Sequence, residues 1–551
     1  MSEPAKPASQ PSGLVLYDTL SASKKPLELL EPGHCRFYTC GPTVYDMSHI
    51  GHGRAAIVPD ILVRVLREAG VRVTYVRNVT DIDDKILRRA VDEGISHTAV
   101  AEKYTDAYHA DLDALGCLRP DIEPRVTGHV PQIVDLIQRL VDAGLAYPQD
   151  GDVYYRVDRF KPYGALSKRC LDDLLAGARV EVNERKENPL DFVLWKGAKP
   201  GEPFWASPWG PGRPGWHIEC SAMALTHLGE SFDLHGGGRD LIFPHHENEI
   251  AQSQGALGSG TFARHWLHNG FIDFAGEKMS KSLGNFFTIR EVTALYPPES
   301  LRYFILGVHY RSGLNFDVQV PCPSCGHLLE PDDQQPGRAC PACAAPHDAA
   351  RLRAHIRFPG LEEADERLAY VYDTLARTHK ALSAAPGALS AAPGALSAAP
   401  GASEPAQNNV ATSVEAMLPA FIAALRDDLN TAAALAVLSE PLREVNRLLE
   451  LKKKPEIAAR EPTLRRFIAD MAGVARHLGL FAADPATWLR QRRDRKAARL
   501  RLDVAEVERL LQMRDAARAK KDWKEADRLR AELGLRGVTL QDSAEGSTWT
   551  L

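Results

Sequence analysis

The sequence has few cysteines, no long apolar run and no N-terminal targeting pattern. Its nine cysteines are spread over 551 residues, which is too sparse for a secreted disulfide scaffold and fits a reducing compartment. No stretch of about 18 uninterrupted apolar residues occurs, so we expect no membrane-spanning helix. The first residues, MSEPAKPASQPSG, lack the apolar core of a signal peptide. We therefore predict a cytoplasmic chain without membrane contact, with a disordered tail over residues 1–13.

Charge of one sign is not in excess either. The chain has 67 basic and 72 acidic residues, a net charge of -5, and a mean hydropathy of -0.26. These values are typical of a globular protein and exclude a disordered or collagen-like chain. A polyanionic partner would have to meet a local positive patch. The run from Arg490 to Arg501, with seven basic residues and one acidic residue, is either such a patch or a solvated helix face.

Residues 14–318 alternate β-like and helical patterns. Val71 to Val79 has the composition of a strand, and Ile57, Ile61 and Val65 recur at helical spacing. Strand, helix and strand in repetition predict a parallel α/β sheet. Pro59 would either kink this helix or begin a new one.

Three further regions follow. Residues 319–350 are rich in proline and cysteine, which predicts an insertion. Residues 351–485 carry apolar stripes at helical spacing and predict an α-helical bundle. It is interrupted over 381–409 by a low-complexity loop in which ALSAAPG occurs three times. Residues 486–551 predict a small α+β module with a helix near 504–533 and two strands.

Two short motifs point to phosphate chemistry. His49-Ile50-Gly51-His52 lies near an expected helix start, where unpaired backbone N–H groups favour anions. In Lys278-Met279-Ser280-Lys281-Ser282, two ammonium groups on a loop can close over a triphosphate. Each motif alone could be surface histidines or a solvated lysine-rich loop. Their joint occurrence on an α/β background favours the functional interpretation.

These motifs are the signature pair of class I aminoacyl-tRNA synthetases, and four longer segments narrow the resemblance. They are CGPTVYDMSHIGH from Cys40, NVTDIDDK from Asn78, GWHIECSAM from Gly215 and HGGGRDLIFPHHENEIAQS from His235. With them the chain resembles the cysteinyl-tRNA synthetase family over nearly its whole length outside the tail and insertions. The resemblance implies a class I Rossmann-type catalytic domain over 14–318, with insertions, and an anticodon-recognition module over 486–551.

A metal site is expected within the catalytic domain. His245 and Glu249 lie four apart on an expected helix and so share a face, the spacing of paired metal ligands. Cys40 and Cys220 could complete a tetrahedral site, although each of the four residues singly could also be structural. Matching positions of the family hold an active-site zinc, and the resemblance implies Zn²⁺ here. Zinc would separate cysteine from serine, because a thiol deprotonates on binding and a hydroxyl does not.

The resemblance also implies the reaction and the remaining site residues. ATP, with Mg²⁺, and L-cysteine would form cysteinyl-adenylate, and the cysteinyl group would then pass to tRNA(Cys). Catalysis would be mainly positioning and electrostatics. The expected roles are His49, Gly51 and His52 on the triphosphate, Lys278 and Lys281 on the closing loop, Gly236, Gly238 and Asp240 near the nucleotide, and Gly41, Thr43, Thr80, Trp216 and His235 in the amino-acid pocket. The family is usually monomeric in bacteria, so we expect a monomer.

A second metal site is expected in the insertion. Cys322-Pro-Ser-Cys325 and Cys340-Pro-Ala-Cys343 are two CxxC pairs fourteen residues apart, a spacing that predicts a zinc ribbon with four thiolate ligands. A pair of disulfides is the alternative. Four thiolates leave no open coordination position, so this metal would be structural, and its loss would lower stability while sparing cysteine activation.

Two other functions fit part of the pattern. A ligase that joins cysteine to a small amino sugar would share the catalytic motifs but would need neither the bundle nor the terminal module. An RNA-binding protein without catalysis would not need the complete set of Cys40, Cys220, His245 and Glu249 together with both motifs.

Overall fold

The computed structural model describes residues 13–170, 186–258, 260–274, 277–278, 287–334, 338–346, 352–353, 355–383, 410–500, 502–543 and 546–551. The expected tail before Gly13 and nearly all of the expected low-complexity loop lie outside the described residues. The same holds for Met279 to Ser282 of the lysine motif, including Lys281.

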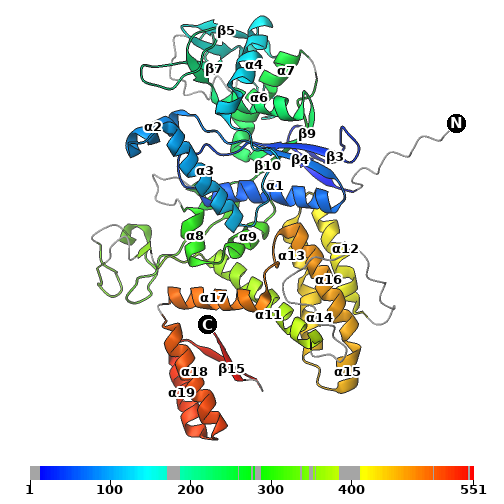
Figure 1. The fold of residues 1–551 in the computed structure, drawn as a ribbon, viewed down its shortest axis with the longest axis vertical. Helices are drawn as coiled ribbons and strands as arrows, with labels where there is room; N and C mark the ends of the chain where they lie inside the picture. Colours follow the sequence, from blue (N-terminus) through cyan, green and yellow to red (C-terminus); the bar gives the residue numbers. More distant parts are fainter. Residues whose placement is uncertain are drawn as a thin grey trace, which may run out of the picture.

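A four-stranded parallel sheet lies at the centre of the catalytic region (Figure 1). Its order is β10-β9-β3-β4, with β3 (His34–Thr39), β4 (Arg72–Arg77), β9 (Phe232–Gly238) and β10 (Ala263–Asn269). A hairpin of β1 (Val15–Asp18) and β2 (Ser23–Pro26) precedes it. The expected α/β class and its parallel sheet are confirmed.

The helix α1 (Ile50–Glu68) connects β3 to β4 and covers one face of the sheet (Figure 1). Ile57 and Ile61 are fully buried in the core that the helix shares with the sheet. Because α1 already begins at Ile50, Pro59 lies inside it and does not begin a new helix.

An insertion between β4 and β9 forms one end of the molecule (Figure 1). It contains a four-stranded antiparallel sheet whose strands follow one another in chain order. The elements are α2 (Asp84–Glu93), α3 (His97–Ala114), η1 (Val126–His129), α4 (Val130–Asp142), β5 (Ala146–Gln149), β6 (Asp152–Tyr155), η2 (Val157–Arg159), β7 (Phe192–Gly197), β8 (Gly212–Pro214), α6 (Trp216–Leu228), and, after β9, η3 (Arg239–Leu241), η4 (Ile242–His246) and α7 (Glu247–Leu257). The helices α4, α6 and α7 pack into the same apolar core as the antiparallel sheet, whereas α2 and α3 lie outside it and α3 contacts α1.

After β10 the chain forms a small three-stranded sheet of order β12-β11-β13 and two short helices. These elements connect the central sheet to the cysteine-rich insertion and to the bundle. They are β11 (Ile272–Phe274), β12 (Glu277–Lys278), α8 (Ile289–Leu295), α9 (Pro298–Leu306) and β13 (Leu314–Asn315), and η5 (Pro331–Gln334) lies within the insertion.

The helical bundle packs against α1 and α9 and extends away from the sheet (Figure 1). Its apolar stripes are buried in the same core as α1. One stripe expected as continuous, from Leu435 to Leu449, is divided between two helices at Leu438. The helices are α11 (Pro359–Ser383), α12 (Thr412–Arg426), α13 (Thr431–Val437), α14 (Ser439–Leu449), α15 (Lys454–Ala459) and α16 (Glu461–Leu478).

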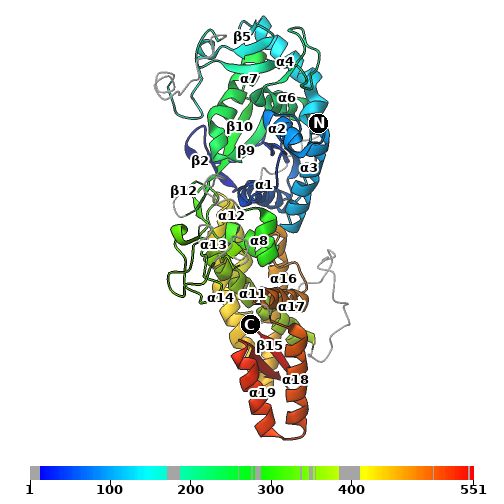
Figure 2. The ribbon, with the colours of Figure 1, turned by 90° about the vertical axis from the view of Figure 1, so that its left-hand side faces the viewer.

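The C-terminal module lies at the opposite end of the molecule from the antiparallel insertion (Figures 1 and 2). Two helices, α18 (Val504–Ala519) and α19 (Trp523–Leu535), pack against a hairpin of β14 (Thr539–Ser543) and β15 (Gly546–Thr550). The single helix expected near 504–533 is wrong. Lys521 has a left-handed φ of 60°, and the side chain of Asp522 accepts from the N–H of Glu525 to cap α19.

The basic run from Arg490 lies on α17 (Pro485–Arg499), which packs against α11. Arg492 pairs with Asp365 at 2.6 Å, and Lys496 pairs with Glu366 at 3.1 Å. Arg499 lies 3.2 Å from Glu362. These three side chains are mostly covered and form ion pairs within the chain, so the solvated-face alternative is wrong for them, while a phosphate contact by the other basic residues of the run stays a prediction.

The part of the chain that the structure describes contains no helix that is both long and apolar enough to cross a membrane.

Candidate active site

The carboxyl ends of the central strands border one cavity of about 400 Å³. Cys40 follows β3, Gly238 ends β9 and Asn269 ends β10, and all three line it. Ligands of parallel α/β sheets bind at this edge. Residues expected from the sequence that line the cavity are Cys40, Gly41, Thr43, His49, Gly51, His52, Thr80, Trp216, Cys220, Gly238, Asp240 and His245.

The four expected metal ligands converge at one wall of this cavity. Cys40 comes from the end of β3, Cys220 from α6, His245 from η4 and Glu249 from α7. Each contributes one ligand atom, and these atoms all lie within 4.8 Å of one another. The Nε2 atom of His245 is 3.1 Å from Oε1 of Glu249. Cys40 Sγ is 3.4 Å from the same oxygen.

A second donor set shares two of these residues. Cys40, His235, His246 and Glu249 also offer ligand atoms within 4.8 Å of one another. His235 and His246 are fully buried and do not line the cavity, whereas Cys220 and His245 do. A catalytic metal keeps one coordination position open to substrate. The set with Cys220 and His245 therefore suits a substrate-binding metal better.

His235 and His246 form a layer behind the ligands. Nε2 of His235 is 2.9 Å from Oε2 of Glu249, and the His235 ring stacks on Trp266 at 4.5 Å. Nδ1 of His246 is 2.7 Å from Nε2 of His268. The structure thus places His235 against Glu249 rather than in the cavity wall. Gly236, inside β9, is also buried and does not line the cavity.

The metal-free donor cluster is strongly coupled electrostatically. Burial opposes ionisation of Glu249, but the neighbouring His235 and His245 hold the pKa of its carboxyl well below the usual range. Burial lowers and the Glu249 carboxylate raises the pKa of His245, which reaches about 10. A hydrogen bond from Cys40 lowers the pKa of the Cys220 thiol to about 6. Burial and the neighbouring Cys220 and Glu249 raise the pKa of the Cys40 thiol well above the usual range, so the cluster holds both ionised groups and a thiol whose proton a bound metal would displace.

The two signature histidines begin α1. His49 precedes the first helical residue, and its backbone N–H donates to Nδ1 of His52 at 3.2 Å. Because Nδ1 accepts, Nε2 of His52 carries the proton. Burial, helped by the charge of Lys85, lowers the pKa of His52 to about 4. At neutral pH this side chain is an uncharged N–H donor beside the positive end of a helix.

The lysine motif begins next to the same cavity. Lys278 ends β12, whose register pairs Asp273 with Lys278, and Ile272 of the neighbouring strand lines the cavity. On the far side of the motif, the N–H of Ile50 donates to the carbonyl of Phe287 at 3.2 Å. The strand that ends at Lys278 therefore lies beside the cavity, and the chain after the motif contacts the start of α1. Lys281 itself lies outside the described residues.

Gly41 is required by a close approach of two strand ends. A Cβ atom at this position would lie 1.6 Å from the carbonyl oxygen of Asn78. The N–H of Gly41 donates to Oδ1 of Asn78 at 2.9 Å. A larger residue would separate the segments that carry Cys40 and Thr80.

Three buried charged residues of the site were not expected from the sequence. Arg77 lines the cavity with only 3% of its surface exposed, and its guanidinium nitrogens have no hydrogen-bond partner among the described residues. Arg54 donates to four backbone carbonyls, including that of Ser312 at 2.6 Å. Glu219 accepts from the Thr80 hydroxyl at 3.0 Å, and burial raises the pKa of its carboxyl well above the usual range.

A sequence signal existed for one of them. Arg77 ends a strand of the parallel sheet, directly before the Asn78 segment. A basic residue at the carboxyl end of such a strand points to the ligand edge. Arg54 and Glu219 interrupt helical patterns and carry no comparable signal.

The four cysteines of the insertion also converge. Their sulfur atoms lie within 4.8 Å of one another. This cluster belongs to the segment after β13 and is separate in sequence and donor set from the cavity.

Comparison with known domains agrees with this geometry. Residues 26–320 match the catalytic domain of class I (C) tRNA synthetases, residues 420–482 match a DALR domain, and residues 502–549 match the anticodon-binding domain of cysteinyl-tRNA ligases. A solved structure of Mycobacterium tuberculosis methionyl-tRNA synthetase in complex with methionyl-adenylate superposes with a TM-score of 0.55. It is 16% identical and covers 83% of this chain and 95% of its own. The matched domains and the fold are those of a class I aminoacyl-tRNA synthetase.

Full-length relatives narrow this class. The cysteine–tRNA ligase of Anaeromyxobacter sp. (strain K) is 48% identical over 97% of this chain and 98% of its own length. That of Trichlorobacter lovleyi is 46% identical over 97% of this chain and 99% of its own. The chain belongs to the cysteine–tRNA ligase family.

Proposed function

We propose that this chain attaches L-cysteine to tRNA(Cys) in an ATP-dependent reaction that proceeds through cysteinyl-adenylate. We further propose that it selects cysteine with zinc held by Cys40, Cys220, His245 and Glu249. The observation that carries this proposal is the convergence of these four donors on a cavity that also contains His49 and His52.

The donor set fits zinc. Two sulfurs, one imidazole nitrogen and one carboxylate oxygen are the ligand types that Zn²⁺ takes in proteins. When bound there, zinc would supply a Lewis acid that prefers a thiolate to a hydroxyl. Trp216 stacks on the His245 ring at 4.4 Å and lines the cavity, so its indole fixes one face of the amino-acid pocket. Thr80, held by Glu219, offers a polar group on another wall.

The nucleotide would lie along the N-terminus of α1. His52 is uncharged and offers its Nε2 proton, while backbone N–H groups of the helix start favour the phosphate charge. Gly238 and Asp240 line the cavity beyond β9, where we place the rest of ATP with its Mg²⁺. Lys278 and Lys281 would neutralise charge as the loop closes.

The acceptor is better explained as tRNA than as an amino sugar. Residues 502–549 match an anticodon-binding domain, and an enzyme that acts on a small acceptor would not need such a domain. We also propose that the chain works as a monomer in a reducing cytoplasm, which its free thiols favour; size-exclusion chromatography with light scattering tests the monomer.

The test is ATP–pyrophosphate exchange with cysteine and with serine, before and after the metal is removed by a chelator. We expect exchange with cysteine to exceed exchange with serine by at least about 10⁴, to be lost with the metal and to return with Zn²⁺. Cys220→Ala should lose both zinc and exchange. Cys35→Ala, at a buried thiol of β3 outside the cluster, is the matched control. Metal-independent exchange would contradict the proposal.

A further inference from the structure

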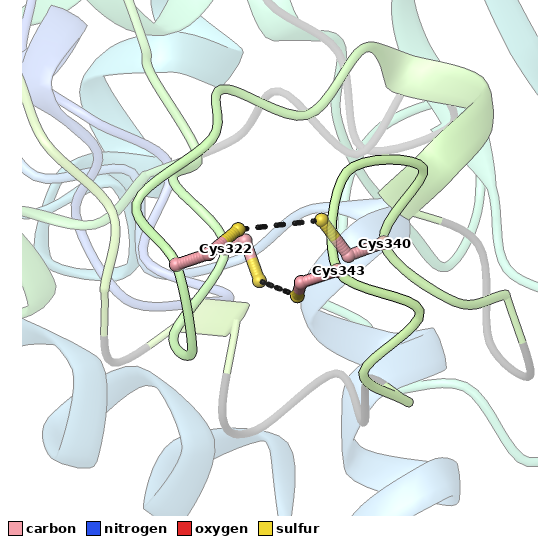
Figure 3. Close-up of side chains that lie close together, drawn as sticks. Cys322, Cys340 and Cys343 are labelled. Carbon is pink, nitrogen blue, oxygen red and sulfur yellow. Dashed lines mark hydrogen bonds between the residues drawn. The ribbon is translucent and has the colours of Figure 1, made fainter.

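The cysteine-rich insertion after β13 has the geometry of a second metal site. Figure 3 shows Cys322, Cys340 and Cys343 with their sulfur atoms directed towards one another. The Sγ atoms of Cys322 and Cys343 are 3.7 Å apart, and those of Cys325 and Cys340 are 3.6 Å apart. A tetrahedron with Zn–S bonds of about 2.3 Å has edges of about 3.8 Å. The observed spacing is therefore that of four thiolates around one zinc ion.

The backbone repeats the same turn at both CxxC pairs. The N–H of Cys322 donates to the carbonyl of His327 at 2.7 Å, and the N–H of Cys340 donates to that of Ala345 at 2.9 Å. Gly326 donates back to Cys322 at 2.9 Å, and Ala344 donates back to Cys340 at 2.8 Å. Two equivalent turns facing each other form a built site rather than a chance cluster of thiols.

A disulfide arrangement fits less well. The sulfur separations of 3.7 and 3.6 Å join the two turns crosswise and are far above the S–S bond length of about 2.05 Å. All four thiols are free. The N–H of Ser324 points at Cys322 Sγ at 3.4 Å, as expected for a sulfur that carries negative charge.

The insertion is connected to the segment that follows the lysine motif. Its two stems meet where Gln319 pairs with Arg357. The buried Cys322 and Cys340 belong to the same apolar core as Phe287 and Phe358, whose rings are 5.1 Å apart. Phe287 is the first described residue after the motif loop.

An ion pair makes a second connection. Arg353, in the segment that returns from the insertion to the Arg357 stem, pairs with Glu291 and lies over the Phe287 ring at 5.8 Å. Glu291 accepts from the Thr288 hydroxyl at 2.9 Å, and Thr288 pairs with His49 of the active site. The insertion is thus connected to the backbone that follows the lysine motif.

We propose that Cys322, Cys325, Cys340 and Cys343 bind one structural Zn²⁺, and that this ion keeps the insertion folded so that it supports residues 287–291 beside the lysine motif. The second half of this statement rests on the proposed function, because it assigns the loop to ATP. It differs from the expectation that loss of this metal spares cysteine activation.

The test compares Cys325→Ser with Cys170→Ser in the full-length protein. Both change an exposed cysteine, but Cys170 lies outside the cluster. Plasma mass spectrometry should find about two zinc ions per chain in the wild type and in Cys170→Ser, and about one in Cys325→Ser. Cys325→Ser should also melt at a lower temperature and show a KM for ATP raised at least about threefold, with an unchanged KM for cysteine.

The possible failures are distinguishable. Retention of both ions by Cys325→Ser, or a thiol titration that finds fewer than nine free cysteines in the metal-free, unfolded protein, would refute the four-thiolate site. Loss of one ion with an unchanged KM for ATP would refute the support of the loop. A wild type with a single ion that Cys220→Ala removes would refute this site and leave the proposed function intact.

Discussion

Arg77 and Arg54 show how two buried guanidinium groups of one cavity differ. Both line the cavity and are almost fully buried. Both terminal nitrogens of Arg54 donate to backbone carbonyls, whereas Arg77 makes no hydrogen bond among the described residues and lies over the rings of Tyr75 and Tyr108, at 5.8 and 5.4 Å. An unpaired buried charge is costly, so it persists only where it is needed. A group left without a partner at the ligand edge is available to an anion.

We predict opposite stability effects for Arg77→Met and Arg54→Met. Arg77→Met removes a buried charge that makes no hydrogen bond among the described residues, so the free energy of unfolding should rise by about 1 kcal/mol, while ATP–pyrophosphate exchange falls at least about tenfold. Arg54→Met removes the charged donor of four carbonyls, three of which keep a backbone N–H donor, and should lower the free energy of unfolding by about 2 kcal/mol. Urea unfolding measures both values. An Arg77→Met protein that is less stable and fully active would contradict the assignment.

At the scale of single elements, the sequence predicted the types of most helices and strands but not all of their breaks. The strand expected before the signature histidines, the helix start at His49 and the helical face shared by His245 and Glu249 follow from local patterns. The break between α18 and α19 does not, because the apolar spacing continues across it. Its signal was Asp522, a capping residue followed by Glu525.

The long-range part of the site could not be derived from spacing. The parallel pairing of β3 with β9, together with α6, brings Cys40 and Cys220 to Glu249. Which strands pair cannot be predicted from the sequence of either segment alone. The family resemblance supplied those partners. It also suggested His235 for the pocket wall, whereas packing against Trp266 places that ring behind Glu249.

A buried ion pair fastens the bundle to the catalytic domain. Asp60 of α1 pairs with Arg302 of α9, and Arg302 also donates to the carbonyl of Leu478 at the end of α16 at 2.7 Å. Burial would raise the pKa of Asp60, but Arg302 and Arg64 hold it below its ordinary value of 3.8. A lowered carboxyl pKa stabilises the fold above the unfolded value, and this contribution is lost as the pH falls through the folded value.

Asp60→Asn should therefore lower the free energy of unfolding by about 3 kcal/mol at pH 7, and the difference from wild type should shrink below about pH 4. Glu68→Gln is the matched control, because Glu68 also connects α1 to α16, through an exposed pair with Arg476 at 3.0 Å. Its effect should be at most about 0.5 kcal/mol. Equal effects of the two variants in chemical unfolding would show that burial of the pair is irrelevant.

The two turns of the cysteine insertion provide an internal comparison. Gly326 has a φ of +77° and Ala344, at the equivalent position, has a φ of +56°. The left-handed region costs an L-residue about 1 kcal/mol relative to glycine. Gly326→Ala should therefore weaken zinc retention about fivefold and Ala344→Gly should strengthen it by a similar factor. Competition with a chromophoric chelator measures both. The same direction of change in the two variants would rule out equivalent turns.

On the scale of the whole molecule, the C-terminal module has an apolar core that is separate from the core of the catalytic sheet and the bundle. The catalytic sheet and the bundle share one continuous core, while the C-terminal module has its own, built around Leu510, Leu529 and Trp549. Its connection to the rest includes α17, where Arg493 lies over the Trp549 ring at 4.3 Å and Lys496 donates to the Leu551 carbonyl at 3.0 Å. The module therefore folds largely independently of the active-site cavity.

This division predicts that the two half-reactions can be separated. A chain ending at Leu500 keeps the shared core and the cavity intact, so cysteine-dependent ATP–pyrophosphate exchange should stay within about twofold of wild type. Aminoacylation of tRNA(Cys) should fall at least about 100-fold, because the part that matches an anticodon-binding domain is gone. Trp549→Ala removes the Arg493 contact and the hydrogen bond to Glu508 at 2.8 Å. Its aminoacylation activity should lie between that of the wild type and that of the shortened chain. If the shortened chain charges tRNA(Cys) normally, the terminal module is not needed for tRNA recognition, and that recognition must lie in the catalytic domain and the bundle.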